Sequence, residues 1–342
     1  MDTVNPLVSV LMSVYNEDTV LINEAIESII NQSFKDFEFI IIGDNPINDR
    51  VINIIKDFSR KDKRISFYVN ETNIGLTKSL NRGLRLCRGK YVVRMDADDI
   101  SLPNRIKEQV AFMEKNTQVV AAGANVILID ETGKEIGKSD VYLKDIDIKT
   151  SLIFQSSLIH PATILRRVID GKVWCYDEYY KYSQDYALWV SFLDYRLGNI
   201  HEVLLKYRIS SSQITSSKRD EQLNYTKQIQ EKALNYYGLK LNSGEADILF
   251  RLACNNKSLS KEDDECVNKF VRNFIKHSII NLNNESRRVC KKWVVNYYIR
   301  YITNNPTNWY NTVQKYLIFG LSTKNLNFSS FMLLVKLLIT SK

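Results

Sequence analysis

Three aspartates that could bind a metal ion, Asp96, Asp98 and Asp99, lie within four positions of the sequence. In an extended segment alternate side chains share one side, so the spacing of two places Asp96 beside Asp98. Like charges this close repel, and a cation between them relieves the repulsion. Mg²⁺ and Mn²⁺ commonly combine one or two carboxylates with substrate phosphate oxygens and make a diphosphate a better leaving group. The run predicts either such a site or a solvated acidic turn before a helix, whose N-terminus favours acids.

Apolar segments of the kind that form buried strands precede these aspartates and other polar residues. The segments at 7–14, 37–42, 65–69 and 91–95 predict strands, and helical patterns, including those at 20–30 and 76–87, separate them. This alternation predicts an α/β fold with a mostly parallel sheet that helices cover on both faces. Ligands bind such sheets at the carboxyl ends of the strands, where residues 15–17, 44 and 96–99 stand. We therefore expect these polar residues to line one crevice.

The later part of the chain predicts fewer strands and more helices. Pro103 begins a predicted helix that runs to about Lys115, because a proline is tolerated in the first helical turn. Residues 118–129 and the turn at 131–133 predict a strand that enters a hairpin. Further elements are a helix at 184–195, a strand at 200–207 and, from about Asp220 onward, helices alone.

The five cysteines are widely separated, include no C-x-x-C pair and have no histidine at metal-ligand spacing. This pattern fits a reducing compartment and argues against a zinc site. The N-terminus lacks the basic start and apolar stretch of a signal peptide, and no run reaches the roughly 18 to 20 apolar residues that span a bilayer. We therefore expect the main domain to lie in the cytoplasm.

Six runs, in order and spacing, resemble the inverting nucleotide-sugar glycosyltransferases of family 2, which have the GT-A fold. The longer runs are VSVLMSVYNE at 8–17, NQSFKDFEFIIIGDN at 31–45, NIGLTKSLNRGL at 73–84 and GKYVVRMDADDISLPNRI at 89–106. The shorter runs are IHPATILRR at 159–167 and SQDYALW at 183–189. The resemblance covers about residues 6–208. It implies a Rossmann-like GT-A catalytic domain at residues 1–215, followed by an α-helical region at residues 216–342.

The resemblance implies a nucleotide pocket after the first two strands. Tyr15 would pack against the base, and Ser13 and Glu17 would line the same pocket. Asp44 would accept a hydrogen bond from the base, most simply from N3–H of uracil. Many family members carry two acids at this turn, whereas this chain has Gly43 in the first position, which leaves the nucleotide open.

The resemblance also implies the residues that hold the diphosphate and the metal. Asn73 and Lys78 would face the ribose and diphosphate, although a solvated helix lysine is an alternative for Lys78. Asp98 would bind Mn²⁺ or Mg²⁺ directly, and Asp96 would bind the ribose or a metal-bound water. Both aspartates are therefore candidate metal ligands.

Asp185, in the run SQDYALW, matches the catalytic base of the family. Direct displacement at the anomeric carbon needs a carboxylate that removes the proton of the acceptor hydroxyl, on the face opposite the departing diphosphate. An aspartate that caps the start of a helix is the alternative interpretation. His160 would close the acceptor side or serve as a buried structural histidine.

The net charge of +8 is concentrated near the C-terminal end. Residues 286–342 contain nine basic residues and no acid, so removing these nine charges leaves the first 285 residues at about −1. The basic residues are Arg287, Arg288, Lys291, Lys292, Arg300, Lys315, Lys324, Lys336 and Lys342. The accompanying aromatic residues are Trp293, Tyr297, Tyr298, Tyr301, Trp309, Tyr310, Tyr316 and Phe319.

Cations combined with aromatic side chains suit an anionic membrane surface, where each basic residue contributes about 1 kcal/mol. A helical cap on the catalytic domain and a homo-oligomer contact are the alternatives. Nucleic acid is disfavoured as a partner because no recognition motif accompanies the charge.

These patterns together predict a bacterial-type enzyme that is peripheral on the inner face of the cell membrane. It would transfer a hexose from a UDP-sugar to a hydroxyl of a growing, lipid-linked surface glycan of the O-antigen or capsule type, with inversion. A nucleotidyltransferase on a related fold is disfavoured because no glycine-rich, basic phosphate loop follows the first strand. A non-catalytic nucleotide-sugar-binding protein would leave Asp98 and Asp185 idle.

Overall fold

The computed structural model describes residues 5–209, 216–254 and 263–304 of the 342-residue chain. The chain divides into two compact units. The first contains residues 1–149 and 156–229, and the second contains residues 150–155 and 230–342. The predicted segment 331–339 and the basic residues beyond Arg300 lie outside the described residues. The expected boundary after residue 215 stays a prediction.

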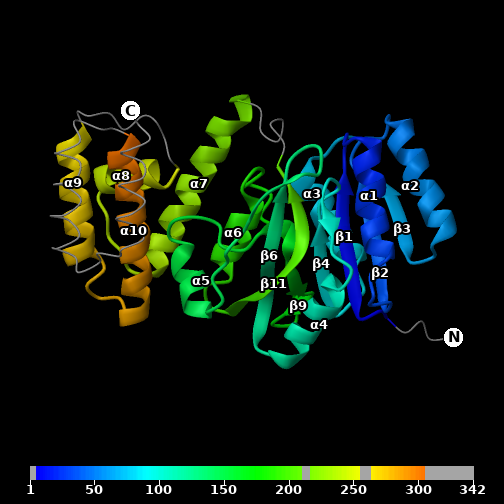
Figure 1. The fold of residues 1–342 in the computed structure, drawn as a ribbon, viewed down its shortest axis with the longest axis horizontal. Coiled ribbons are helices and arrows are strands. Elements are labelled where there is room, and N and C mark those ends of the chain that lie inside the picture. The colour runs from blue at the N-terminus through cyan, green and yellow to red at the C-terminus, as the bar shows by residue number, and fades with distance from the viewer. Residues whose placement is uncertain (1–4, 210–215, 255–262, 305–342) are drawn as a thin grey trace. The chain divides into compact units, whose positions relative to one another are not determined.

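A mixed sheet, nine-stranded within the described residues, forms the centre of the first unit (Figure 1). The strand order is β3-β2-β1-β4-β8-β6-β11-β5, and β7 pairs with β6. Strands β3, β2, β1 and β4 are mutually parallel, β8 is antiparallel to both of its neighbours, and β6 and β11 are parallel. The strands are β1 (Val8–Val14), β2 (Phe37–Gly43), β3 (Ile65–Val69), β4 (Tyr91–Met95), β5 (Ile100–Ser101), β6 (Val119–Ile129), β7 (Glu135–Lys138), β8 (Ile164–Arg166) and β11 (Arg196–Arg208).

The helices of the first unit cover both faces of this sheet. They are α1 (Thr19–Ile30), α2 (Asp49–Lys61), α3 (Leu76–Leu86), α4 (Arg105–Lys115), α5 (Asp145–Ser151), the 3₁₀ turn η1 (His160–Ala162), α6 (Gln184–Ser191) and the first part of α7 (Ser216–Tyr236). Val10 and Met12 of β1 share a core with α1, α2 and α4. Leu11 points to the other face, against Gly83 of α3. The predicted α/β class with helices on both faces is confirmed.

The close approach of α3 to the sheet depends on Gly83. A Cβ atom at this position would lie 2.2 Å from Cδ1 of Leu11 and 3.2 Å from Cγ1 of Ile42, and both side chains are buried. The glycine therefore sets the distance between α3 and strands β1 and β2. This contact fixes where the N-terminal end of α3 stands relative to the strand ends.

Several predicted elements differ in length from the observed ones. The helix expected at Pro103 begins at Arg105, because the residues before it form a turn in which Arg105 N–H donates to the Leu102 carbonyl at 3.0 Å. The helix expected to run to Tyr195 ends at Ser191. The predicted strand at 200–207 extends over Arg196–Arg208, since it pairs with most of β6.

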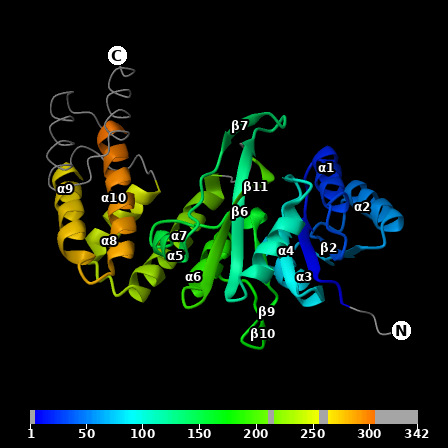
Figure 2. The same cartoon turned by 60° about the horizontal axis from the view of Figure 1, so that its bottom comes forward.

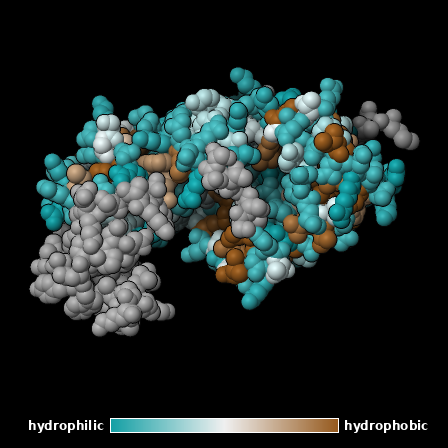
Figure 3. All heavy atoms as spheres, turned by 90° about the horizontal axis from the view of Figure 1, so that it is seen from above, coloured by the Kyte–Doolittle hydropathy of each residue, from teal (hydrophilic) through white to brown (hydrophobic). Residues whose placement is uncertain are grey.

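The hairpin expected near residue 131 is confirmed as β6 and β7. A second, two-stranded sheet is formed by β9 (Val168–Ile169) and β10 (Lys172–Val173). It lies at the opposite end of β6 and β11 from β7 (Figure 2). In the view of Figure 3, hydrophilic side chains cover most of the described surface, as expected where the apolar strands are buried.

The described part of the second unit is helical. It contains the end of α7, α8 (Ser243–Ala253), α9 (Asp264–Asn273), a π-helical turn (Phe274–Ser278) and α10 (Asn284–Asn304). Phe154 joins their core, where its ring contacts the rings of Phe274, Trp293 and Tyr297. In the part of the chain that the structure describes, no helix combines the length and the apolar character needed to cross a bilayer.

Candidate active site

Ser13 and Arg94 lie on the face of the sheet that α3 covers. Arg94 pairs in register with Leu11, which contacts α3, and Ser13 stands two residues after Leu11 on the same face. Asp96 continues the alternation just beyond β4, and its carboxylate forms an ion pair with the Arg94 guanidinium. Ser13 and Arg94 are buried, and Asp96 is half-buried. The structure thus brings these three residues together at the carboxyl ends of β1 and β4.

Glu17 faces the aspartates that follow β4. Its carboxylate accepts a hydrogen bond from the Tyr15 backbone N–H at 2.7 Å. Burial raises the pKa of Glu17, and the charges of Asp98 and Asp96 raise it further, while the backbone hydrogen bonds oppose the shift. Glu17, Asp96 and Asp98 therefore form one group of carboxylates, contributed by two neighbouring strand ends.

Asp99, the third aspartate of the run, has a structural role. Its side chain is fully buried, and Oδ1 accepts a hydrogen bond from the Arg208 backbone N–H at 2.8 Å. The Arg208 side chain donates to the Asp98 carbonyl at 2.8 Å and to the Glu24 carboxylate at 3.0 Å. These bonds fasten the acidic turn to β11 and α1, and they leave the Asp98 side chain half-buried beside Asp96.

Asp44 organises the loop that leads into α3. Its carboxylate accepts hydrogen bonds from Asn70 Nδ2 at 2.7 Å, the Ile74 N–H at 2.9 Å and the Gly75 N–H at 2.8 Å. The Asn73 side chain accepts from the same Gly75 N–H at 3.1 Å, so Asp44 and Asn73 both contact Gly75. Gly75 has a φ of 87°, a conformation that favours glycine.

Tyr15, Asn73 and Lys78 are exposed at the strand and helix ends where the sequence predicts a nucleotide. The Tyr15 side chain is 46% exposed, which leaves its ring accessible to a planar group. Lys78 lies in the first turn of α3, next to the loop that Asp44 holds. A backbone N–H cluster at a helix start together with a lysine suits a phosphate group.

Asp185 stands in the first turn of α6 and is half-buried. Burial raises the pKa of Asp185, and the Asp96 charge adds to this, whereas backbone hydrogen bonds and the Arg94 charge lower it. Burial raises the pKa values of the Tyr176 and Tyr207 hydroxyls, and the charges of Asp185 and Asp96 raise them further. The predicted base and the predicted metal carboxylates therefore belong to the same site.

His160 lies in the wall of this site. Its Nε2 forms a hydrogen bond with the Tyr176 hydroxyl at 2.7 Å, and its ring contacts the Trp189 ring edge-on. Burial and the nearby charge of Arg94 hold the pKa of His160 well below its usual range, so the imidazole is neutral. Trp189 is fully buried and is a core residue.

The residues after β4 fit a divalent cation that is completed by ligand oxygens. No group of three or more histidine, cysteine, aspartate or glutamate side chains within the described residues has the arrangement of a metal site. Asp96 shares a carboxylate oxygen with Arg94, and Asp98 follows it by two residues, so the predicted ligands lie in one turn. Two carboxylates with phosphate oxygens are a common set for Mg²⁺.

Arg94, Tyr176 and Tyr207 are site residues that the motifs do not single out. For Arg94 a signal exists, because an arginine inside the apolar strand Tyr91–Met95, two residues before Asp96, must share the face of that aspartate. Tyr207 lies on β11, which reaches the acidic turn only through long-range sheet pairing. The sequence pattern carries no comparable signal for Tyr176 and Tyr207.

Sequence comparison places this geometry in a family. Residues 9–174 match the family described as Glycosyl transferase family 2. An uncharacterised glycosyltransferase of Methanocaldococcus jannaschii is 42% identical over 240 residues, which cover 69% of this chain and 79% of the relative. The O-antigen biosynthesis glycosyltransferase WbnJ of Escherichia coli is 31% identical over 236 residues, 68% of this chain and 85% of the relative.

Solved structures agree on the fold. TarS 1-349 of S. aureus, in complex with UDP-GlcNAc, aligns with a TM-score of 0.56 at 17% identity and covers 88% of this chain and 93% of its own. The mannosyltransferase PcManGT of Pyrobaculum calidifontis, in complex with GDP-Man and Mn²⁺, aligns with a TM-score of 0.51 at 13% identity and covers 88% of each chain. On the family match and the identity to its relatives, this chain belongs to glycosyl transferase family 2 and is a glycosyltransferase with a GT-A-type fold.

Proposed function

We propose that this glycosyltransferase moves a hexose from a UDP-sugar to a hydroxyl of a growing surface glycan, with inversion at the anomeric carbon and with Mn²⁺ or Mg²⁺ as cofactor. The observation that supports the proposal is the shared electrostatic environment of Asp185, Asp96 and Arg94. A base and a leaving-group site must stand near each other, on opposite faces of the sugar, for direct displacement. The relationship to WbnJ supports a surface glycan as the acceptor.

In the proposed reaction, Asp185 accepts the proton of the acceptor hydroxyl while that oxygen attacks the anomeric carbon. Asp98, with Asp96 beside it, would hold the metal, which supplies positive charge to the departing diphosphate. Lys78 and the backbone N–H groups at the start of α3 bind the phosphates from the other side. One protein carboxylate suffices as base, because the diphosphate leaves without protonation by a second acid.

The nucleotide would occupy the ends of β1 and β2. Tyr15 packs against the base, Ser13 and Glu17 line the pocket, and Asn73 faces the ribose. Asp44 would act on the nucleotide chiefly through the loop whose N–H groups it holds. Its carboxylate would also accept a hydrogen bond from the base, most simply from N3–H of uracil. The UDP-GlcNAc complex of TarS supports UDP, and the GDP-Man complex of PcManGT makes GDP-mannose the donor to exclude.

A donor screen tests the proposed function. Purified protein with Mn²⁺ is incubated with UDP-glucose, UDP-galactose, their N-acetyl forms and GDP-mannose, and nucleotide release is measured with and without EDTA. We expect metal-dependent release from one UDP-sugar, and its loss by at least about a hundredfold in Asp98→Ala and Asp185→Ala. Asp18→Asn is the matched control, because Asp18 only caps α1. Release from GDP-mannose alone, or release unaffected by EDTA, would contradict the proposal.

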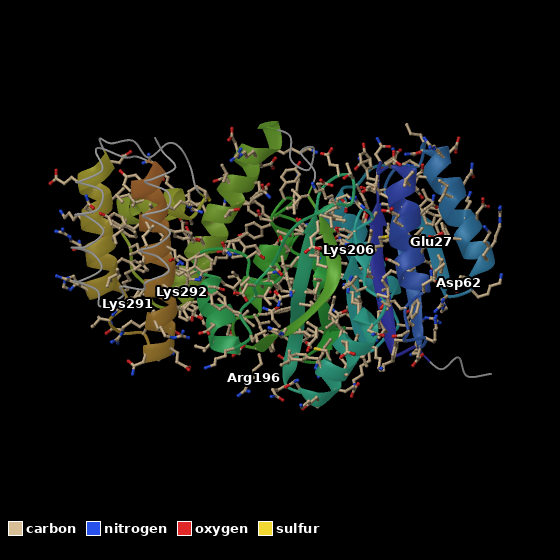
Figure 4. All side chains as sticks on the ribbon, in the orientation of Figure 1. Glu27, Asp62, Arg196, Lys206, Lys291 and Lys292 are labelled. Carbon is tan, nitrogen blue, oxygen red and sulfur yellow. The ribbon has the colours of Figure 1, made fainter. Side chains whose placement is uncertain are left out.

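We further propose that the acceptor is lipid-linked and that the basic C-terminal region meets an anionic membrane surface. Within the described part of this region, Tyr297, Tyr298 and Tyr301 are buried in the helical core, so the attraction would rest on cations. Arg288 and Lys292 of α10 are exposed, and Figure 4 labels Lys292 and its neighbour Lys291. This charge would hold the enzyme beside a lipid-linked glycan.

Vesicle binding tests the membrane proposal. We expect the full chain to sediment with anionic vesicles at low salt and to be released as salt is raised, because exposed charges are screened. The double variant Lys291→Gln and Lys292→Gln should bind about tenfold or more less tightly, at about 1 kcal/mol per cation. Lys56→Gln with Lys61→Gln, both exposed on α2, is the matched control. Equal binding to neutral and anionic vesicles would contradict the proposal.

A further inference from the structure

Arg94 is a buried cation with unused hydrogen-bond donors. Its side chain is 1% exposed, and one terminal nitrogen, Nη2, pairs with Asp96. The other two nitrogens, Nε and Nη1, have no partner among the described residues. They carry three N–H groups, which in a folded protein are almost always satisfied by an acceptor. The acceptor is therefore expected to arrive with a ligand.

Gln184, which precedes the proposed base Asp185 in the sequence, has an unused hydrogen-bond acceptor. Oε1 of Gln184, which is buried next to Asp185, has no donor among the described residues. A ligand that satisfies both residues must accept hydrogen bonds from Arg94 and donate one to Gln184. Hydroxyl groups do both, whereas a carboxylate or phosphate only accepts.

The charges around Arg94 also favour a neutral ligand. Its guanidinium pairs with Asp96, and its charge acts on Asp185, His160 and Tyr176. The carboxylates of Asp96 and Asp185 offset the charges of Arg94 and of Arg105, a second buried cation close by. A second anion would be repelled by these carboxylates, and a sugar hydroxyl would not.

On the proposed function, Arg94 would stand beside the transferred sugar. It interacts with Asp96, on the proposed diphosphate side, and with Asp185, on the proposed acceptor side. In a direct displacement the sugar ring occupies the space between the leaving group and the base. A buried arginine at this position can form hydrogen bonds with the sugar ring without contacting the nucleotide.

We propose that Arg94 is a sugar-recognition residue whose Nε and Nη1 groups donate hydrogen bonds to hydroxyl oxygens of the transferred sugar, with Gln184 accepting from the same sugar. This inference rests on the proposed function, because it requires a nucleotide-sugar donor. It predicts that substituting Arg94 weakens the binding of the nucleotide sugar more than the binding of the nucleotide alone.

Calorimetric titrations with Mn²⁺ test the inference. UDP and the UDP-sugar that the wild-type protein binds, from UDP-glucose, UDP-galactose and their N-acetyl forms, are titrated into wild type, Arg94→Gln and Arg94→Lys. We expect Arg94→Gln to weaken the UDP-sugar at least about tenfold more than UDP, because charge-assisted hydrogen bonds are lost only with the sugar. Arg94→Lys keeps the charge and should recover part of this difference.

Arg166→Gln is the matched control. Arg166 is a half-buried arginine of β8 that donates to the backbone carbonyls of Val119 and Met113. It pairs with Tyr91 at the start of β4, at the other end of that strand from Asp96. It should leave both affinities unchanged. Equal weakening of UDP and UDP-sugar in Arg94→Gln, or no weakening, would overturn the inference. If Arg94→Gln does not fold, the same comparison in Arg94→Lys decides. Failure of wild type to bind any nucleotide sugar would instead refute the proposed function.

Discussion

At the scale of single residues, Asp185 meets two conflicting requirements. A general base must be ionised, yet burial and the Asp96 charge favour its protonated form. Backbone hydrogen bonds and, after them, the Arg94 charge act in the opposite direction and lower the pKa of Asp185. The net effect is a raised pKa, so the ionised form of Asp185 is a stronger proton acceptor than an exposed aspartate.

The raised pKa of Asp185 predicts the pH dependence of transfer. Since the ionised form acts as base, kcat/KM should fall as the pH drops through the folded-state pKa, which lies above the usual value of about 3.9. A pH-rate profile of the wild type against Asp18→Asn checks this, because Asp18 caps α1, has no proposed role in transfer and should leave the profile unchanged. An acid limb at or below the usual aspartate value would contradict the prediction.

The raised pKa of Asp185 also predicts that removing its charge, in Asp185→Asn, stabilises the folded protein at neutral pH. Because the folded-state pKa exceeds the unfolded value, the stabilising contribution is complete below the unfolded pKa and is lost as pH rises through the folded pKa. At neutral pH the wild type therefore holds a disfavoured buried charge, and Asp185→Asn should melt at a higher temperature. The difference in Tm should shrink as the pH is lowered. A lower Tm of Asp185→Asn at neutral pH would show that its backbone hydrogen bonds outweigh burial.

Residue-level prediction from sequence depends on whether a side chain lies on a strand or in a motif. Asp96, Asp98 and Asp185 stand in motifs, and the structure brings them into one electrostatic group with Glu17. Arg94 follows from strand alternation alone. Tyr207 could not be predicted, because its approach to the acids depends on the pairing of β11 with β5 and β6.

At the scale of elements, the site is assembled by a few buried side chains that tie strand ends to loops. Arg105 of α4 donates to the Arg94 carbonyl at 2.5 Å and to the Pro161 carbonyl at 2.6 Å, so it joins β4 to η1. Asp44 likewise joins the end of β2 to the loop before α3, where it accepts from the Ile74 and Gly75 N–H groups. Both residues therefore position the strand ends and loops of the site.

Asp44→Ala tests this positioning role. The change leaves the Ile74 N–H without its acceptor and removes one of two acceptors from the Gly75 N–H and from the Asn70 amide, at about 1–3 kcal/mol for an unsatisfied buried group. We expect the free energy of unfolding in urea to fall by about that amount and UDP affinity to fall with it. Asp49→Ala, in the first turn of the neighbouring α2, is the control. Loss of UDP affinity at unchanged stability would assign Asp44 to direct base recognition instead.

Long apolar elements were predictable, and short ones were not. The strands at 37–43, 65–69 and 91–95 match their predicted positions because each forms an apolar run in the sequence, and the first and third are buried along their whole length. Strands β5 and β8 span two and three residues and exist only through their sheet partners. Local pattern carries no signal for such pairing.

At the scale of the whole chain, a short segment between β7 and η1 belongs to the helical unit. Residues 150–155 group with residues 230–342, and Ile153 and Phe154 are buried among the helices. Thr150 also bonds the Ser286 hydroxyl at 3.1 Å. Dividing the chain at a single residue cannot describe this arrangement, because it depends on contacts between residues more than a hundred positions apart.

The first part of α7 belongs, in turn, with the sheet. Gln222 Nε2 donates to the Tyr182 carbonyl at 2.9 Å, and the Tyr225 ring contacts Tyr179 and Tyr180 edge-on. These contacts support the segment that leads into α6 and Asp185. A chain that ends after residue 215 would lose them, although it retains every motif of the family.

Two shortened chains test where the catalytic domain ends. Both carry Ile153→Ser and Phe154→Ser, so that apolar residues normally buried by the helical unit do not cause aggregation. The chain ending after Ile229 should melt cooperatively and bind UDP with Mn²⁺. The chain ending after residue 215 should be less stable by several kcal/mol, since aromatic pairs alone contribute about 0.5–1.5 kcal/mol each beyond their buried area. Equal melting temperatures and UDP affinities would place the boundary at residue 215 and assign α7 no part in holding Asp185.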